Sequence, residues 1–221
     1  MKWTELPIVG FDVETTGFDA LTGRVIQFGF CLYDPIERKF TRELIGECDT
    51  DGVAIDPGAQ KAHGISAERV AGKPSFDARL PEIIAFLKSL PPMHVALAFN
   101  APFDLGFLVA ACARRGLAMP IDVAQVLDPL PIARTLWRYG NKLTEVCPRV
   151  GVKLDFAHDA GFDAKAAVLC ELAFAAHGQI GTDLVDVLRQ QASACAGWER
   201  RTKHSYWGEY ERVCAGLAEK T

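Results

Sequence analysis

The sequence predicts an α/β domain built on a mixed sheet with helices packed against it. Three β-branched and aromatic segments come first in the chain, and short apolar runs then alternate with segments of helical spacing. The chain has 221 residues, of which 49% are hydrophobic, and a typical domain has about 150 residues. These values are typical of one globular domain with an appendage, and they exclude a wholly disordered chain.

Five segments are predicted to be the strands of this sheet: residues 8–14, 24–33, 39–45, 95–99 and 123–127. The first three follow one another through short connections, which favours an antiparallel meander. Asp34-Pro35 is typical of the turn between the second strand and the third. The last two strands are separated by helical segments, so we expect the complete sheet to be mixed.

Five further segments are predicted to be helices: residues 58–63, 75–90, 102–115, 141–150 and 160–176. In the second of these, Phe76, Leu80 and Ile83 recur at helical spacing and predict one buried face. A glycine follows each of the last three segments and is expected to end the helix there.

We expect residues 1–180 to form the main domain and residues 181–221 to form a helical C-terminal extension. The extension contains two of the four tryptophans, Trp198 and Trp207, and a basic cluster at residues 200–204. Packing against the main domain is its expected role, and an aromatic, basic surface for nucleic acid is the alternative.

The formal net charge is −4, from 24 Lys and Arg residues against 28 Asp and Glu residues. This mild acidity argues against nucleic-acid binding through charge alone, but not against binding through metal ions. The seven cysteines include no CxxC pair, which fits free thiols in a reducing compartment. The sequence shows no secretory signal and no apolar run of about 18 residues, so we predict a cytoplasmic protein without membrane contact.

Asp12 and Glu14 end the first predicted strand, within the run FDVETTG. Side chains two residues apart on a strand point to the same face, so the two carboxylates would repel each other and be costly to bury. A divalent cation would offset that cost, and oxygen ligands suit Mg²⁺ or Mn²⁺. The alternative is a strand end that emerges into solvent, where acidic side chains are common.

Further acidic residues stand at the starts of two predicted helices. Asp104 lies in the run NAPFD, just after the fourth strand, and Asp163 follows His158 by five residues in HDAGFDA. Each acid alone has a helix-dipole explanation, and Asp159 is the better N-cap of the second helix. Together with Asp12 and Glu14 of the first strand, however, these two acids make four carboxylates, which could balance two divalent cations. His158 could then serve as the general base.

The runs FDVETTG, NAPFD and HDAGFDA, in this order, resemble the three motifs of the DEDDh family, the DnaQ-like 3′–5′ exonucleases. The similarity covers the chain from about residue 5 to residue 178. His158 matches the histidine subtype of the family, because Asp159 stands where the other subtype has a tyrosine. The resemblance implies a ribonuclease H-like fold with a five-stranded mixed sheet, and a hydrolase that releases nucleoside 5′-monophosphates.

The resemblance also implies roles for individual residues. Asp12, Glu14, Asp104 and Asp163 would bind two divalent metal ions, Mg²⁺ or Mn²⁺, and His158 would be the catalytic base. Six further residues would contact the substrate: Thr15, Thr16, Gly17, His63, Asn100 and Phe103.

Two positions depart from the family pattern. Gln27 stands where many relatives have glutamate, and Asp128-Pro129-Leu130 replaces a frequent Asp-Thr-Leu. No motif residue is missing, so we expect an active enzyme. Besides the basic cluster of the extension, several cations could steer a nucleic-acid strand toward the site: Arg24, Arg114, Arg115, Arg134, Arg138 and Lys142.

The expected substrate is the 3′ end of a single-stranded or frayed nucleic acid, with DNA favoured, as in proofreading or repair. One alternative is an RNA-trimming 3′–5′ exoribonuclease. Another is a non-catalytic accessory subunit that holds a 3′ end in a polymerase complex. A polymerase or replication complex and a second copy of the chain both stay open as partners.

Overall fold

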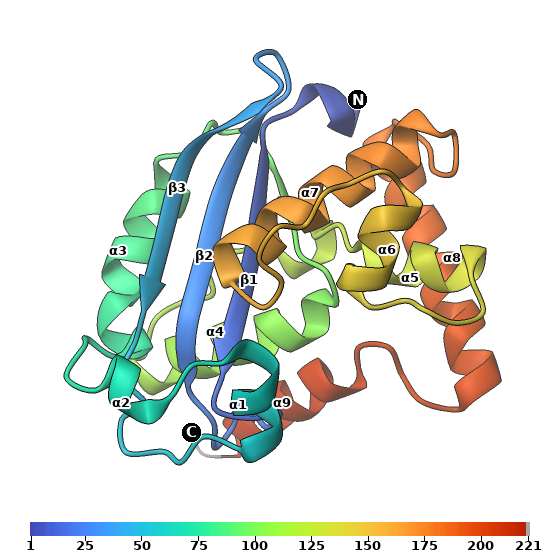
Figure 1. Ribbon diagram of the computed structural model, residues 1–221. Coiled ribbons are helices and arrows are strands. Elements are labelled where there is room, and N and C mark those ends of the chain that lie inside the picture. Colours follow the sequence, from blue (N-terminus) through green and yellow to red (C-terminus); the bar gives the residue numbers. More distant parts are fainter. Residues whose placement is uncertain (220–221) are drawn as a thin grey trace.

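Four strands form the central sheet, in the order β3-β2-β1-β4, in the computed structural model, which describes residues 1–219 (Figure 1). Their bounds are Ile8–Thr15 for β1, Val25–Asp34 for β2, Lys39–Glu47 for β3 and Val95–Leu97 for β4. The first three strands pair antiparallel and confirm the predicted meander, whereas β4 pairs parallel with β1. The sheet is therefore mixed, as the sequence predicts.

The prediction of a fifth strand is wrong for the described residues. Val123–Gln125 form a 3₁₀ turn, in which the Asp122 side chain accepts a hydrogen bond from the Ala124 amide. Leu127 then makes a single parallel bridge to Leu97. The apolar side chains at the end of this segment are buried in the core, and this burial, rather than strand pairing, accounts for the apolar run.

Nine α-helices accompany the sheet in the described part of the chain. They are α1 Pro57–His63, α2 Ala67–Val70, α3 Phe76–Lys88, α4 Ala101–Arg114, α5 Pro129–Leu136, α6 Leu143–Arg149, α7 Ala160–Ala176, α8 Leu184–Thr202 and α9 Gly208–Ala218. All five helices predicted for the main domain are present with ends within a few residues. Two helices were not predicted, namely α2, which has one turn, and α5, which begins at the unusual Asp128-Pro129.

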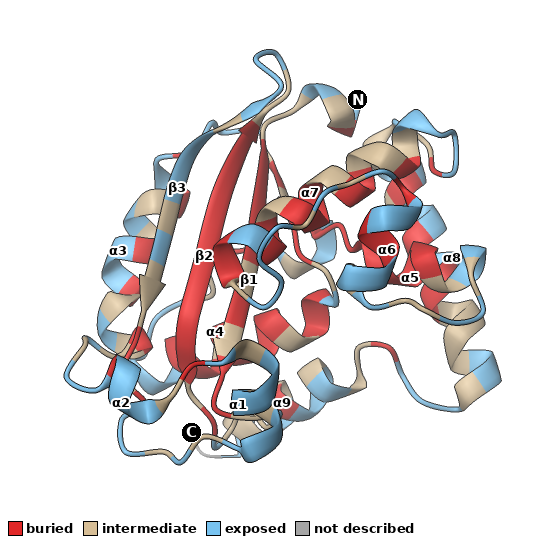
Figure 2. Ribbon diagram, viewed as in Figure 1, coloured by how far each residue is buried: buried red, intermediate tan, exposed pale blue. Residues whose placement is uncertain are grey.

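The alternation of β1 divides the apolar residues between two cores, one on each face of the sheet. Val9, Phe11 and Val13 point to the face covered by α3 and α4. Ile8 points to the other face, where α5, α6, α7 and α8 supply the rest of the core. Figure 2 shows β1 and β2 buried along most of their length between these layers.

Small residues allow α7 to lie directly on β1 and β2 (Figure 1). A Cβ atom at Gly10 would lie 2.5 Å from the carbonyl oxygen of Ala164, and one at Gly29 would lie 2.7 Å from that of Ala160. Both approaches are closer than real Cβ contacts allow, so glycine is required at both positions. This packing fixes the start of α7 beside the end of β1.

The C-terminal extension packs on the main domain, through α8 against α5 and α9 against α4. Val213 of α9 is fully buried in the core beneath the sheet, and Gln191 of α8 is buried as well. The Gln191 amide accepts a hydrogen bond from the Asp128 N–H and donates one to the Val126 carbonyl. Among the described residues, none of the helices is both long and apolar enough to span a membrane.

Candidate active site

Strand pairing brings three of the predicted acids to one edge of the sheet. Asp12 and Glu14 lie on the same face of β1, which is the face that α7 covers. Because β4 runs parallel to β1, its carboxyl end lies at the same edge, and α4 starts just beyond it. Asp104, in the first turn of α4, is buried there and accepts a 2.9 Å hydrogen bond from the Val13 amide.

The loop before α7 supplies His158, and the first turn of α7 supplies Asp163. Asp159 caps the helix, as expected, by accepting hydrogen bonds from the Gly161 and Phe162 amides. His158 has a left-handed backbone with φ of 64°, and its N–H donates a 3.1 Å hydrogen bond to Asp163 Oδ2. The loop and the first turn of α7 therefore hold a histidine and a carboxylate next to each other.

Gln27 of β2 fixes this loop to the sheet. Its side-chain amide donates to Asp159 Oδ2 at 3.0 Å and accepts from the Ala160 amide at the same distance. A glutamate at this position could only accept, and it would lie beside a second carboxylate. The departure from the family pattern thus has a structural role, because the amide matches the carboxylate at position 159.

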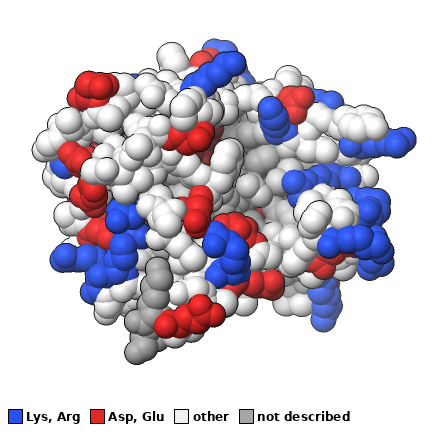
Figure 3. Space-filling model, turned by 90° about the horizontal axis from the view of Figure 1, so that it is seen from below, with Lys and Arg blue, Asp and Glu red and all other residues white. Residues whose placement is uncertain are grey.

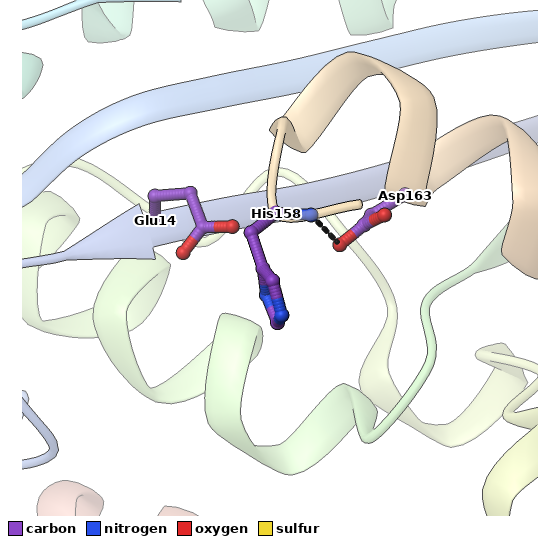
Figure 4. A group of neighbouring side chains, drawn as sticks. All are labelled: Glu14, His158 and Asp163. Carbon is purple, nitrogen blue, oxygen red and sulfur yellow. Dashed lines mark hydrogen bonds between the residues drawn. The ribbon is translucent and has the colours of Figure 1, made fainter. Parts of the chain in front are cut away.

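These elements meet at one cavity of about 780 Å³. Asp12, Glu14, Asp104, His158 and Asp163 all line it, so the structure brings the five predicted catalytic residues together. Ligand atoms of Glu14, His158 and Asp163 lie within 4.8 Å of one another. Figure 4 shows His158 between the two carboxylates, with its backbone N–H bonded to Asp163.

Burial raises the pKa values of all four acids, and neighbouring carboxyl groups raise them further. Burial is the largest cause in each case, and it raises the pKa of Glu14 to about 8 and that of Asp163 to about 6. The pKa of Asp12 is raised further by Asp104, whereas the Val13 N–H partly opposes the rise for Asp104. Four repelling carboxyl groups in one cavity are an arrangement that a bound cation would stabilise.

The donor set fits divalent metal ions. It consists of hard carboxylate oxygens, and the buried Oδ1 of Asp163 has no hydrogen-bond partner among the described residues. The four carboxylates would supply four negative charges, enough for two divalent ions. His158 lies close enough to Glu14 and Asp163 to be a further candidate ligand.

The predicted substrate residues after β1 point into the fold. The Thr15 hydroxyl donates to the Gly17 carbonyl at 2.7 Å, and the Thr16 hydroxyl accepts from the Arg24 amide at 2.9 Å. Both threonines are buried, and neither they nor Gly17 line the cavity. Their side chains therefore shape the turn at the cavity rim, and their contact with substrate stays a prediction.

His63 lies beside the site rather than in its cavity. It shares a smaller, neighbouring pocket with His158 and Gln27, and its Nδ1 accepts a hydrogen bond from the Ile65 amide. Its Nε2 is buried without a hydrogen-bond partner among the described residues, and burial lowers the pKa of the ring. His63 therefore lies beside the loop that carries His158.

Asn100 and Phe103 do line the cavity, as predicted. Asn100 has a left-handed backbone with φ of 68°, a conformation that asparagine tolerates. Phe103 packs edge-on against Phe18, which is 77% exposed and also lines the cavity. Phe18 is not among the predicted site residues, although an aromatic residue directly after the first motif is a signal that could have indicated it.

The candidate strand-steering cations have different surroundings. Arg114 is bonded through two nitrogens to Asp77, and Arg24 donates to two carbonyls of its own turn. Arg134 and Lys142, in contrast, line the cavity. Figure 3 shows Lys and Arg side chains gathered on the right of the molecule, the side on which α5, α6 and α8 lie in Figure 1.

The fold and this cavity together define an α/β enzyme of the ribonuclease H-like class. The family model RNase_T, described as Exonuclease, matches residues 9–170, and the chain belongs to this exonuclease family. The resemblance to the DEDDh exonucleases that the three motifs predict is thereby confirmed, and so is the prediction of an exonuclease enzyme.

Curated relatives include DNA polymerase proteins. The chain is 34% identical over 168 residues to a PolC-type DNA polymerase III of Streptococcus suis, covering 72% of this chain and 10% of that protein. It is 29% identical over 148 residues to a DNA polymerase III subunit epsilon of Pasteurella multocida, covering 64% of this chain and 56% of that subunit. The chain therefore spans only part of the length of these relatives.

Solved structures share the fold. Exonuclease I of E. coli, in complex with a dT13 oligonucleotide, matches with a TM-score of 0.65 and 20% identity over 77% of this chain and 41% of that chain. The nuclease domain of 3′hExo, a DEDDh family member bound to rAMP, matches with a TM-score of 0.60 and 15% identity. This match covers 78% of this chain and 92% of that chain. At these low sequence identities, the structural similarity shows that this chain shares the fold of those proteins.

Proposed function

We propose that the protein is a metal-dependent 3′–5′ exonuclease that hydrolyses the terminal phosphodiester of single-stranded or frayed nucleic acid. The observation that carries this proposal is the meeting of four carboxylates, from β1, α4 and α7, with His158 around one cavity. The carboxylates come from parts of the chain about 150 residues apart, and their repulsion has no structural benefit. Such a cluster indicates a site that binds cations and performs chemistry.

Asp12, Glu14, Asp104 and Asp163 would hold two divalent ions. When bound, such ions would neutralise the phosphate and favour ionisation of the attacking water. His158 would accept the proton of that water as it attacks phosphorus. The new P–O bond forms as the bond to the 3′-oxygen of the penultimate nucleotide breaks, which releases a nucleoside 5′-monophosphate. Phe18 and Phe103 offer aromatic faces for the terminal base or sugar.

DNA is the favoured substrate, and a polymerase or replication complex in the cytoplasm is the favoured setting. Both parts of the proposal are supported by the PolC-type and epsilon relatives, whose names are those of DNA polymerase proteins. The solved 3′hExo domain was bound to rAMP, so RNA belongs in the same test. A second copy of the chain is a further partner to be tested.

The test is degradation of single-stranded DNA and RNA of matched sequence, each labelled at the 5′ or the 3′ end. We expect a ladder that shortens from the 3′ end with Mg²⁺ or Mn²⁺ and stops with EDTA. Asp163→Asn removes the charge of a ligand but keeps an oxygen for the His158 N–H. It should lower the rate by more than about 100-fold, a loss typical of a key electrostatic group.

Asp186→Asn is the matched control, because Asp186 is an exposed acid on α8 that pairs with Arg189 and does not line the cavity. It should keep the wild-type rate. Full activity of Asp163→Asn, or cleavage that proceeds in EDTA, would contradict the proposal. Binding of the oligonucleotide without cleavage in either metal would support the accessory-subunit alternative instead.

A further inference from the structure

We infer that Arg134, held by two aromatic side chains of the C-terminal extension, binds a phosphate of the substrate strand next to the scissile one. This inference rests on the proposed function, because it assigns a binding role within the same cavity. It also gives the extension a place in the substrate site, beyond packing on the main domain.

The position of Arg134 is fixed by aromatic contacts alone. Its guanidinium carbon lies 4.7 Å from the ring centre of Trp198 and 5.4 Å from that of Tyr206, while the side chain also lines the cavity with the acids. Within residues 1–219 this side chain makes no hydrogen bond and no ion pair. The aromatic faces thus orient the cation and leave its N–H donors unused.

The unused N–H donors of Arg134, in the cavity that the four acids also line, need an explanation. Two other arginines of this chain, in contrast, use their donors: Arg114 is bonded to Asp77, and Arg149 donates to the Tyr139 carbonyl. A planar guanidinium matches two phosphate oxygens at once, and stacking on aromatic rings keeps it in one orientation. The chemistry that fits Arg134 is therefore a phosphate or phosphodiester.

The phosphate next to the scissile one is the better partner. The scissile phosphate would lie against the metal ions, which neutralise it, whereas its neighbour needs a cation from the protein. Among the described residues that line the cavity, Arg134 and Lys142 supply the Arg and Lys side chains. Both belong to the α5–α6 region, on the side where Figure 3 shows cations gathered.

The extension also connects Arg134 to the catalytic acids. The Tyr206 hydroxyl donates to Asp128, whose carboxylate also accepts from the amides of Asn100 and Ala101 at the start of α4. Asp104 lies three residues beyond Ala101 on the same helix. The same tyrosine therefore contacts the arginine with its ring and the capping carboxylate of α4 with its hydroxyl.

The experiment compares the wild type with Arg134→Ala, Arg134→Lys and Arg189→Ala in binding a 5′-fluorescein-labelled dT10 with Ca²⁺ in place of Mg²⁺. Arg189→Ala is the control and should keep the wild-type Kd, since Arg189 is an exposed residue of α8 that pairs with Asp186 and does not line the cavity. We expect Arg134→Ala to raise the Kd about 10- to 100-fold, the range for one lost charged hydrogen-bond pair. For Arg134→Ala, the slope of log K against log salt concentration should become less steep by about 0.7, the value for one phosphate contact on a single strand.

Arg134→Lys keeps the charge and should keep the salt slope while losing part of the affinity, because lysine lacks the planar fork. Trp198→Leu keeps apolar bulk but removes the aromatic face, and it should weaken binding in the same direction. Thermal unfolding of each variant shows whether the fold is kept.

A second substrate separates this inference from the proposed function. The p-nitrophenyl ester of thymidine 5′-monophosphate contains one phosphodiester and no neighbouring phosphate, so Arg134→Ala should hydrolyse it at the wild-type rate. An unchanged Kd and salt slope for Arg134→Ala would overturn the inference. So would an equal loss of the hydrolysis rate on dT10 and on the ester. A wild type that binds dT10 but cleaves neither substrate contradicts the proposed function, and the Kd comparison still decides the role of Arg134.

Discussion

Glu171, on α7, is a fully buried carboxylic acid away from the catalytic cavity. Neither of its oxygens has a hydrogen-bond partner within the described part of the chain. Burial, with a smaller contribution from Asp128, raises the pKa of this carboxyl group to about 8. The residue is therefore mostly protonated in the folded protein at neutral pH.

This raised pKa predicts a pH-dependent stability. The folded state holds a proton that the unfolded state releases at lower pH, so the free energy of unfolding falls as pH rises from about 4.5 to about 8. Glu171→Gln replaces the protonated acid by a neutral group of similar shape and should remove this part of the loss. Urea unfolding should show the variant more stable at pH 8 by a few kcal/mol, with little difference at pH 5. A constant difference between the two pH values would contradict the assignment.

Asp128 is the opposite case, a buried carboxylate with its hydrogen bonds made. It accepts from the amides of Asn100, Ala101 and Leu130 and from the Tyr206 hydroxyl. Asp128→Asn turns one acceptor into a donor that faces other donors, so it should destabilise the fold by about 1–3 kcal/mol. Activity should fall as well, because the start of α4 carries Asp104. Asp122→Asn, at an exposed cap, is the matched control, and denaturant unfolding with a nuclease assay measures both effects.

The meeting of residues in the candidate site could largely be predicted residue by residue. Alternation along β1 places Asp12 and Glu14 on one face, and the cap at Asp159 leaves Asp163 beside His158. The environment of Arg134 could not be predicted in this way. Its aromatic partners, Trp198 and Tyr206, lie more than 60 residues further along the chain, and no local pattern specifies such a contact.

At the scale of elements, the contact between α7 and the sheet depends on backbone proximity. Gly29→Ala would put a methyl group 2.7 Å from the Ala160 carbonyl oxygen, so α7 must move away from β2. We expect a loss of about 1–3 kcal/mol in the free energy of unfolding, together with lower activity as His158 and Asp163 shift. Thermal unfolding and the nuclease assay measure the two effects. Gly181→Ala is the control, because its added methyl would meet only ordinary contacts at 3.6 Å or more.

The elements with clear periodicity were predicted well, and the failures have physical reasons. Residues 123–127 are apolar because they are buried, and a short buried run cannot be told from a strand by composition. Helix α5 has two prolines in its first three residues, Pro129 and Pro131, which read as a loop. Pro129 occupies the first helical position, where its missing N–H costs nothing.

At the scale of the whole molecule, the C-terminal extension contributes side chains to the hydrophobic core of the main domain. Val213 is buried among residues of α4, and Tyr206 and Cys195 cover Leu130. A chain that ends at residue 182 would expose these surfaces and leave Asp128 without the Tyr206 hydroxyl and the Gln191 amide. We expect it to be insoluble or to unfold at least roughly 10 °C lower than the full chain.

Expression of the two chains and their thermal unfolding by circular dichroism test this prediction. A shortened chain as stable as the full one would show instead that the main domain folds without α8 and α9, in agreement with the division predicted from composition. That division follows a change in residue composition, whereas the contacts of α8 and α9 depend on surfaces that composition does not reveal.

The packing of α7 on β1 also has a consequence for synthesis on the ribosome. The contact between Gly10 and Ala164 joins residues separated by most of the chain, so the catalytic face of the sheet has no cover while the first 150 residues emerge. The nascent protein therefore exposes an apolar surface until α7 is released, and α8 and α9 arrive later still. Folding of these residues is expected to finish only after α9 has left the ribosome, which makes the nascent chain a client for chaperones that bind apolar segments.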